Sequence, residues 1–279
     1  MTGIPSVTLN NGVTMPQLGY GVFQIPDEGA ATAVSTALRE GYRSVDTAAV
    51  YANEKGTGAA LAASDVPRDE LFVTTKLWNG ASTTWTRDLV LREFDASLER
   101  LGLEYVDLYL IHWPHPMRDE YLTIWRAFEE IARSGRARAI GVSNFQPAHL
   151  RRLVAETDTV PAVNQIELHP WLQQAELRSL HAELGIATEA WSPLGQGKLL
   201  DAPALARIAD KHGRTPAQIV LRWHLQLGNV VIPKSATPSR IRENIDVLGF
   251  ALDEEDLAAL AALDNGTRLG PDPDTFDAN

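Results

Sequence analysis

Short apolar runs alternate with amphipathic stretches along most of the chain. Most of these runs are apolar at consecutive positions, which is typical of parallel strands covered on both faces. The predicted strands are Gln17–Gly21, Arg43–Asp46, Leu71–Lys76, Val106–His112, Ala137–Val142, Ala162–Glu167, Ala187–Ala190 and Val230–Ile232. Amphipathic helices such as Asp88–Leu101 and Leu122–Arg133 lie between them. Eight such units predict an α/β fold, a closed (β/α)8 TIM barrel rather than an open sheet.

A hairpin precedes this repeat. Its predicted strands are Val7–Leu9 and Val13–Met15, and Asn10-Asn11-Gly12 connects them. Because Asn-Gly suits a two-residue turn that requires positive φ, we predict that turn here. We expect the hairpin to plug the floor of the barrel.

Two extra helices lie outside the repeat, at Ala202–His212 and Glu254–Leu263. The first precedes the helix Thr215–Leu227, in which Thr215 is a predicted N-cap followed by proline. Residues Asn265–Asn279 are rich in Gly, Pro and Asp. This composition predicts a loop or tail that becomes ordered only when it makes contacts. No linker or shift in composition divides the chain, so we expect one domain spanning residues 1–279.

Composition narrows the class of protein. The chain has 279 residues, no cysteine and a formal net charge of −11. The lack of cysteine excludes disulfides, thiolate catalysis and cysteine metal sites, and we expect no metal. The negative charge disfavours nucleic acid and anionic membranes as partners. Because no leader or membrane-length apolar run is present, we expect a cytoplasmic protein. We also expect a monomer.

Polar side chains with catalytic potential follow the predicted strands, where a barrel of this type places its active site. Asp46, Lys76 and His112 end three successive strands, and Tyr51 lies in the loop after Asp46. A nearby ammonium lowers the pKa of a phenol, ordinarily about 10, and a carboxylate fixes the ammonium. Together these groups could deliver a proton to a carbonyl oxygen. Singly, each also suits an ordinary role as a cap, solvated strand end, loop anchor or core histidine.

Later strand ends offer groups that suit a dinucleotide, although the chain lacks Gly-x-Gly-x-x-Gly after a first strand. Ser143, Asn144 and Gln165 could hold a carboxamide, and Trp191 could stack beneath a flat ring. A glycine-rich loop with a cation suits a pyrophosphate and includes Ser192, Pro193, Leu194, Gly195, Gln196, Gly197 and Lys198. The amides equally suit backbone caps, and the loop equally suits a flexible turn.

A cluster of cations and hydroxyls follows the last strand and could receive a terminal phosphate at a helix N-terminus. It consists of Lys234, Ser235, Thr237, Arg240 and Asn244. An ordinary solvated helix start has the same composition. Elsewhere, three aromatic residues could line an apolar mouth around a carbonyl substrate, namely Phe23, Trp78 and Trp113.

With these residues in place, the chain resembles the aldo-keto reductase family from the hairpin to about Leu263. The similarity rests on GYRSVDTA (41–48), Tyr51 with Asn53-Glu54, TTKLW (74–78), Val106–Pro114, IGVSNF (140–145), VNQIELHP (163–170) and IPKS (232–235). The stretches LGYGVF (18–23), PLGQGK (193–198) and PAQIVLRWHLQ (216–226) are most similar to the bacterial 2,5-diketo-gluconate reductase branch.

This resemblance implies NADPH-dependent reduction of aldehydes, α-dicarbonyls and some ketones. It implies Tyr51 as general acid tuned by Lys76 and Asp46, with His112 orienting the carbonyl. It also implies that Ser143, Asn144 and Gln165 hold the carboxamide, Trp191 stacks on the nicotinamide, and Lys234, Ser235, Thr237, Arg240 and Asn244 receive the 2′-phosphate. The tail is shorter than in many relatives, so we expect the outer side of the site to be open. The alternative is a regulatory or structural protein that keeps the cofactor barrel without catalysis.

Overall fold

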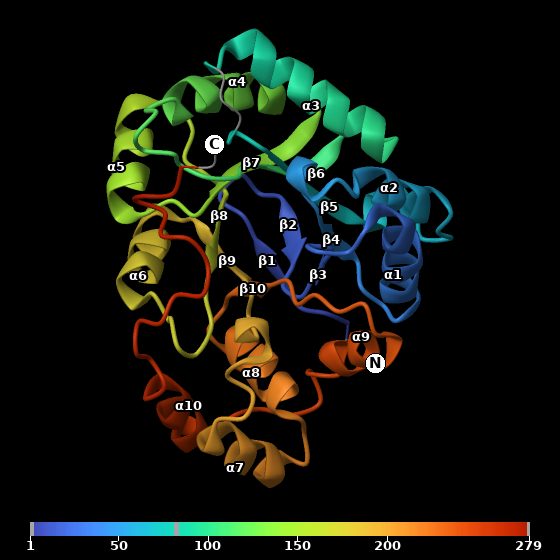
Figure 1. Ribbon diagram of the computed structural model, residues 1–279, viewed down its shortest axis with the longest axis vertical. Helices are drawn as coiled ribbons and strands as arrows, with labels where there is room; N and C mark the ends of the chain where they lie inside the picture. Colours follow the sequence, from blue (N-terminus) through green and yellow to red (C-terminus); the bar gives the residue numbers. More distant parts are fainter. Residues whose placement is uncertain (1–2, 81–83, 278–279) are drawn as a thin grey trace.

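Residues 3–80 and 84–277 are described by a computed structural model in which a ring of parallel strands is surrounded by helices (Figure 1). The strands are β3 (Tyr20–Gly21), β4 (Ser44–Asp46), β5 (Phe72–Leu77), β6 (Val106–Ile111), β7 (Ala137–Ser143), β8 (Val163–Glu167), β9 (Ala187–Trp191) and β10 (Val230–Val231). Their order in the 8-stranded sheet follows the sequence. The ring closes where Gly19 N donates to Val231 O and Val231 N donates to Gln17 O, both at 2.9 Å. The predicted (β/α)8 barrel is confirmed.

Helices cover the outside of this ring. They are α1 (Asp27–Arg39), α2 (Glu54–Ala62), α3 (Arg87–Leu101), α4 (Tyr121–Arg133), α5 (Pro147–Glu156), α6 (Ala175–Leu184), α8 (Pro216–Gln226) and α9 (Pro238–Ile245). The predicted extra helices are also present, as α7 (Pro203–His212) and α10 (Glu254–Ala261). Thr215 caps α8 as predicted, because its side chain accepts a hydrogen bond from Gln218 N.

The alternation of side chains along each strand separates two apolar clusters. On β6, Leu108 and Leu110 point into the barrel and pack with Met15 of the hairpin. Tyr109 belongs to the other cluster, between barrel and helices, where its ring stacks on Phe128 of α4 at 4.4 Å. The strands are therefore buried on both faces, which explains why their sequences are apolar at consecutive positions.

The hairpin consists of β1 (Ser6–Thr8) and β2 (Thr14–Pro16), and its loop differs from the prediction. Leu9 N donates to Val13 O at 2.8 Å, and Gly12 N donates to Leu9 O at 2.9 Å, which leaves three residues in the loop. Gly12 has φ +86°, whereas Asn11 is not among the positive-φ residues. The loop holds the three residues predicted, Asn10 to Gly12, but the two-residue turn type was wrong, because only Gly12 and not Asn11 has a positive φ. The Asn11 side chain donates to Arg138 O at 2.9 Å. One left-handed glycine after a tight turn is sufficient for a three-residue loop.

The segment after α10 contains neither helix nor strand as far as Thr275, yet it lies along the rim of the barrel. Leu269 N and Gly270 N donate to the Glu167 carboxylate at 2.6 and 2.9 Å. Farther along, the Phe276 ring lies 4.5 Å from that of Trp113. The expected loop is thus ordered in the structure by contacts with the ends of β8 and β6, and it covers part of the side of the site that we expected to be open.

Candidate active site

A buried ion pair lies inside the barrel at the carboxyl ends of β4 and β5. Lys76 Nζ donates to Asp46 Oδ1 at 2.6 Å and to Thr47 O at 2.9 Å, and the Lys76 side chain has no exposed surface. Burial by itself lowers the pKa of Lys76, but the negative charge of Asp46 and its hydrogen bond reverse that effect and raise it. The lysine is therefore held as an ammonium ion.

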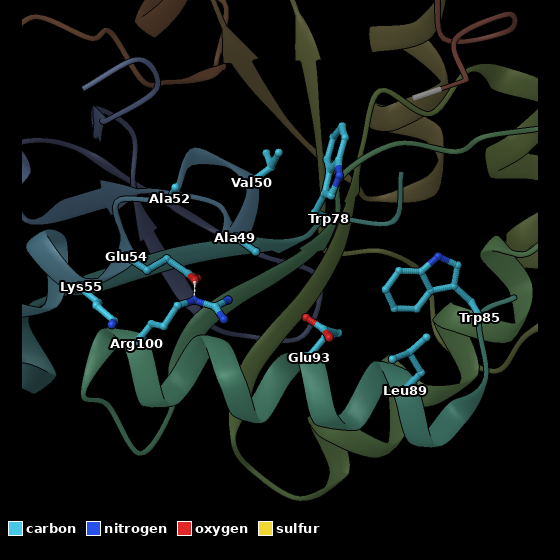
Figure 2. Close-up of a pocket in the computed structure, with 10 residues that line it drawn as sticks. All are labelled: Ala49, Val50, Ala52, Glu54, Lys55, Trp78, Trp85, Leu89, Glu93 and Arg100. Carbon is cyan, nitrogen blue, oxygen red and sulfur yellow. Dashed lines mark hydrogen bonds and ion pairs between the residues drawn. The ribbon is translucent and has the colours of Figure 1, made fainter. Parts of the chain in front are cut away.

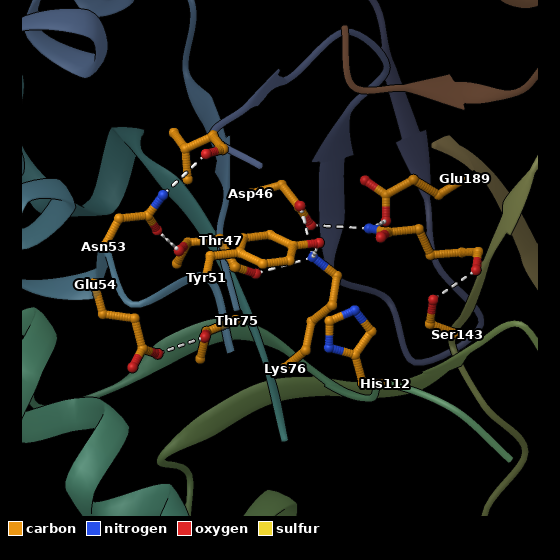
Figure 3. A network of polar contacts seen from close by, with 12 residues as sticks. Asp46, Thr47, Tyr51, Asn53, Glu54, Thr75, Lys76, His112, Ser143 and Glu189 are labelled. Carbon is orange, nitrogen blue, oxygen red and sulfur yellow. Dashed lines mark hydrogen bonds and ion pairs between the residues drawn. The ribbon is translucent and has the colours of Figure 1, made fainter. Parts of the chain in front are cut away.

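The phenol of Tyr51 lies within reach of this ammonium (Figure 3). Tyr51 ends a 3-10 turn, Ala49–Tyr51, and Lys76 Nζ donates to its hydroxyl at 3.5 Å. Burial raises the pKa of Tyr51 more than the charge of Lys76 lowers it, so the pKa is above its ordinary value. The expectation of a net lowered pKa was wrong for the protein without cofactor, because the same burial that places the ammonium beside the phenol also disfavours the phenolate.

His112 completes the group at the end of β6. Its ring lies 5.7 Å from that of Tyr51 and 5.4 Å from that of Trp78, edge to face in both cases. Burial, with the positive charge of Lys76, lowers the pKa of His112 well below its usual value. A neutral imidazole carries one N–H, which can donate to a carbonyl oxygen. The structure thus brings Asp46, Tyr51, Lys76 and His112 together.

The sequence did not point to a second buried carboxyl group beneath these side chains, that of Glu189. The amide Nε2 of Gln165 donates to Asp46 Oδ2 and to Glu189 Oε2, each at 2.8 Å (Figure 3). Glu189 lies on β9 and has no exposed surface. A charged residue inside an apolar strand was the available signal, since buried charges are rarely without a partner.

The groups expected to hold a carboxamide lie on three neighbouring strand ends. Asn144 Nδ2 donates to His112 O at 3.0 Å, and Asn144 Oδ1 accepts from Trp191 Nε1 at 2.8 Å. Ser143 Oγ donates to Gln165 O at 2.8 Å. These bonds join β6, β7, β8 and β9, so the Trp191 ring is held beside the amides. Asn144 and Ser192 both have left-handed backbones, with φ of 65° and 48°.

The glycine-rich loop continues directly from Ser192. Pro193 is buried, Leu194 packs on the core, and Gly195 to Gly197 form a 3-10 turn with positive φ at 53°, 55° and 84°. A Cβ on Gly195 would lie 2.5 Å from the Leu199 side chain, whereas one on Gly197 would meet nothing within 4 Å. The loop thus packs against the protein at Gly195 and leaves free space at Gly197, where a phosphate could approach the backbone.

The cation cluster lies next to that loop in the ring, after β10 and at the start of α9. Ser235 Oγ accepts from Thr237 N at 3.1 Å, and Asn244 is buried on the helix. Lys234 and Arg240 are exposed, and neither forms an ion pair with a carboxylate in the described part of the chain. Since β7, β8, β9 and β10 are consecutive, these residues fit an extended dinucleotide running from Asn144 to the start of α9.

The three aromatic candidates differ in position. The Phe23 ring lies 5.0 Å from that of Tyr51 and is 53% exposed, whereas the Trp78 ring lies 5.4 Å from that of His112. Trp113 is only 7% exposed and lies against Phe276 of the tail. The prediction that the short tail leaves the outer side open was wrong on this side, because Phe276 adds a fourth aromatic ring to the rim.

A groove lies on the outer side of the same rim, between the loop after β4 and α3 (Figure 2). Trp78 and Trp85 line it together with the ion pair of Glu54 and Arg100, whose Oε2 and Nε atoms are 2.6 Å apart. Trp78 therefore separates this groove from the ring of His112. In residues 3–80 and 84–277, no cluster of His, Asp or Glu is arranged to hold a metal ion, and no helix is long and apolar enough to cross a membrane.

Comparison with known proteins agrees with this geometry. The model of the aldo/keto reductase family matches residues 12–265. An aldo-keto reductase of Mycolicibacterium smegmatis is 56% identical over 98% of both chains. Methylglyoxal reductase DkgA of Escherichia coli K12 is 52% identical over 97% of both. The solved structure of a point mutant of Gox0644 in complex with NADPH is 46% identical, with a TM-score of 0.93 over 98% of this chain and 99% of that one.

A family model that covers most of the chain, relatives above 50% identity and a matching barrel with bound NADPH lead to one identification. The alternative of a barrel that has lost catalysis has no support among these relatives. This chain belongs to the aldo/keto reductase family and is an NADPH-dependent oxidoreductase.

Proposed function

We propose that this enzyme reduces aldehydes, α-dicarbonyls and some ketones to alcohols, with Tyr51 as the proton donor. The observation that supports this most directly is that one ammonium group, Lys76 Nζ, contacts both Asp46 and the Tyr51 hydroxyl. The DkgA relatives are named methylglyoxal reductases, which favours compact α-dicarbonyls among the substrates.

The proposed role of each active-site residue follows from its charge. When bound, NADPH supplies the hydride for the carbonyl carbon. Tyr51 gives its proton to the carbonyl oxygen, and the Lys76 ammonium stabilises the phenolate that remains. Asp46 keeps that ammonium in place. Neutral His112 donates a hydrogen bond that orients the carbonyl, and its low pKa prevents a second positive charge beside Lys76.

Cofactor binding is proposed along the ends of β7 to β10. Ser143, Asn144 and Gln165 would bind the carboxamide, and the half-exposed Trp191 would stack on the nicotinamide. The loop of residues 192–197 would follow the pyrophosphate. The 2′-phosphate would be bound by Lys234, Ser235, Thr237, Arg240 and Asn244. We also propose a cytoplasmic monomer acting as one domain of residues 1–279.

Tyr51→Phe tests the assignment of the acid. The variant should lower kcat for methylglyoxal and benzaldehyde by roughly 10²–10⁴-fold, the usual contribution of a general acid, and leave NADPH binding nearly intact. Turnover is followed by the absorbance of the reduced nicotinamide with a panel of carbonyl compounds, with NADPH and with NADH.

Tyr121→Phe on α4 is a matched control, since it removes a phenol hydroxyl that lies near Arg152 and outside the barrel. It should behave as the parent enzyme. Near-parental turnover in Tyr51→Phe would show that Tyr51 is not the proton donor. If the parent enzyme turned over none of the carbonyl compounds, the proposed reaction itself would be overturned.

A further inference from the structure

Glu189 is a buried carboxyl group that the mechanism above does not use. It lies in the middle of β9, where its register partners are Gln165 on β8 and Val230 on β10. Its Oε2 atom accepts from Gln165 Nε2 at 2.8 Å. The other oxygen, Oε1, is buried and has no hydrogen-bond partner within residues 3–80 and 84–277. Such an atom in a tightly packed barrel requires a physical reason.

Gln165 connects this carboxyl group to the reaction site. Its amide nitrogen has two N–H groups, of which one donates to Asp46 Oδ2 and the other to Glu189 Oε2. Because a carboxyl oxygen lies on each side of this nitrogen, the amide can have only one orientation. Its oxygen is directed away from both carboxyl groups, which leaves an acceptor for the carboxamide N–H of the cofactor.

The charges around Glu189 are unbalanced if it is ionised. The groups that act on it are Asp46 from β4, Lys76 from β5 and the Tyr51 phenol, whereas β8 and β10 place the uncharged Gln165 and Val230 beside it. Asp46 already neutralises Lys76. Burial first, and then the charge of Asp46, raise the pKa of Glu189 to about 8. Burial and the neighbouring Asp46 charge thus favour the protonated acid at neutral pH, and burying an unpartnered neutral group costs less than burying an unpartnered charge.

We propose that Glu189 is a positioning residue of the reductase site, which as a neutral acid fixes Gln165 and whose ionisation weakens Tyr51 as a proton donor. The inference rests on the proposed role of Tyr51. When Glu189 releases its proton to solvent, its new negative charge disfavours the phenolate that Tyr51 must become. The charge of Glu189 acts on Tyr51 in the direction that raises the pKa of the phenol. At an effective dielectric constant of about 20–40, a unit charge of this kind changes a rate by roughly four- to fifteenfold.

The kinetic test compares the pH dependence of kcat for methylglyoxal reduction in the parent enzyme and in Glu189→Gln. The glutamine is an isostere of the protonated acid, and its carbonyl can accept the same bond from Gln165. We expect the parent kcat to fall by roughly four- to fifteenfold between about pH 7 and pH 9, and we expect this step to be absent from Glu189→Gln. Glu189→Asp keeps an ionisable group and should keep a step, displaced in pH.

Glu129→Gln is the matched control, because it removes a buried carboxylate on α4 that accepts from Asp158 N and Thr159 N, outside the barrel. It should retain the parent pH profile. An identical alkaline step in Glu189→Gln and the parent would overturn the proposal.

Infrared difference spectroscopy on the protein without cofactor gives a readout that does not depend on turnover. The parent and Glu129→Gln should lose a protonated-carboxyl band as the pH is raised through about 8, and Glu189→Gln should lack that band. Absence of the band from the parent would show that Glu189 is ionised at neutral pH and would refute the proposal even if Glu189→Gln failed to fold. A normal band in a protein that reduces no carbonyl would instead contradict the proposed function alone.

Discussion

The buried position of Tyr51 beside Lys76 has two opposing effects on the pKa of its phenol. The phenol is near enough to Lys76 for a hydrogen bond of 3.5 Å, but the burial that makes this contact strong also raises the pKa. The ammonium therefore acts mainly when the proton leaves, because the charge it stabilises exists only on the phenolate. In the proposed mechanism, Tyr51 resists ionisation at rest and is a stronger proton donor in the transition state.

The preference for NADPH over NADH can also be tested at a single residue, Arg240. Losing one charge-assisted contact to the 2′-phosphate should cost about 1.5–3 kcal/mol. Arg240→Ala should thus weaken NADPH binding by roughly 10–150-fold and change NADH binding little, as measured by quenching of tryptophan fluorescence.

Arg242 on the same helix offers the control, since its Nη2 is already paired with Glu40 Oε1 at 2.8 Å. Arg242→Ala should leave both affinities near those of the parent. Equal losses for NADPH and NADH in Arg240→Ala would place that arginine away from the phosphate.

At the scale of elements, the two helices outside the repeat are joined by a charged cluster. Asp256 on α10 accepts from Lys211 Nζ at 2.9 Å and from His212 Nε2 at 2.7 Å, both at the end of α7. Burial favours the neutral acid, but these bonds outweigh it and lower the pKa of Asp256 to about 2. The sequence predicts each helix from its own periodicity, whereas this link between them depends on the fold.

The link predicts a pH-dependent stability. Because the folded pKa of Asp256 is below that of the unfolded chain, the stabilisation is present above about pH 4 and is lost as the pH falls toward 2. Asp256→Asn should lower the free energy of unfolding by about 1–2 kcal/mol at pH 7, a value discounted because Lys211 is partly exposed. Urea titrations at several pH values should show the difference shrinking below pH 4.

Asp210→Asn, an exposed change on α7, is the control and should have little effect on stability. A difference between Asp256→Asn and the parent that does not depend on pH would mean that the carboxylate charge is not the cause.

At the scale of the whole molecule, the end of the chain returns to the site. The tail is fixed to Glu167 at β8, and His115 Nδ1 lies 3.3 Å from Phe276 O, across 161 positions of sequence. The ring of Phe276 then covers Trp113. One wall of the proposed substrate site thus combines Trp113, after the fourth barrel strand, with Phe276 of the tail.

This arrangement makes a prediction about substrate size. An aromatic contact is worth about 0.5–1.5 kcal/mol, so Trp113→Ala and Phe276→Ala should each raise KM for benzaldehyde by roughly two- to twelvefold and affect methylglyoxal less. Phe250→Ala, whose ring contacts His212 instead, should affect neither substrate. Equal effects on both aldehydes, or a preference for bulky steroid ketones, would contradict the proposed wall.

The sequence by itself determined the barrel, and it marked Asp46, Tyr51, Lys76 and His112 as candidates for one site. Strand and helix periods are local properties, and parallel strands that close into a ring must bring their carboxyl ends together, so Asp46, Lys76 and His112 could be placed near one another. Tyr51 was a candidate from its place in the loop after Asp46, and the cofactor groups were candidates from their places after later strands. The family motifs gave these residues their expected roles.

Only the tertiary structure decided what depends on distance and burial between remote segments. The bridge from Asp46 through Gln165 to Glu189 joins strands that are 119 and 24 positions apart. The sign of the Tyr51 pKa shift follows from a competition between desolvation and charge, which no local pattern encodes. The path of the tail depends on Glu167 accepting two backbone N–H groups from a segment 102 and 103 positions away, because an isolated loop has no such partner.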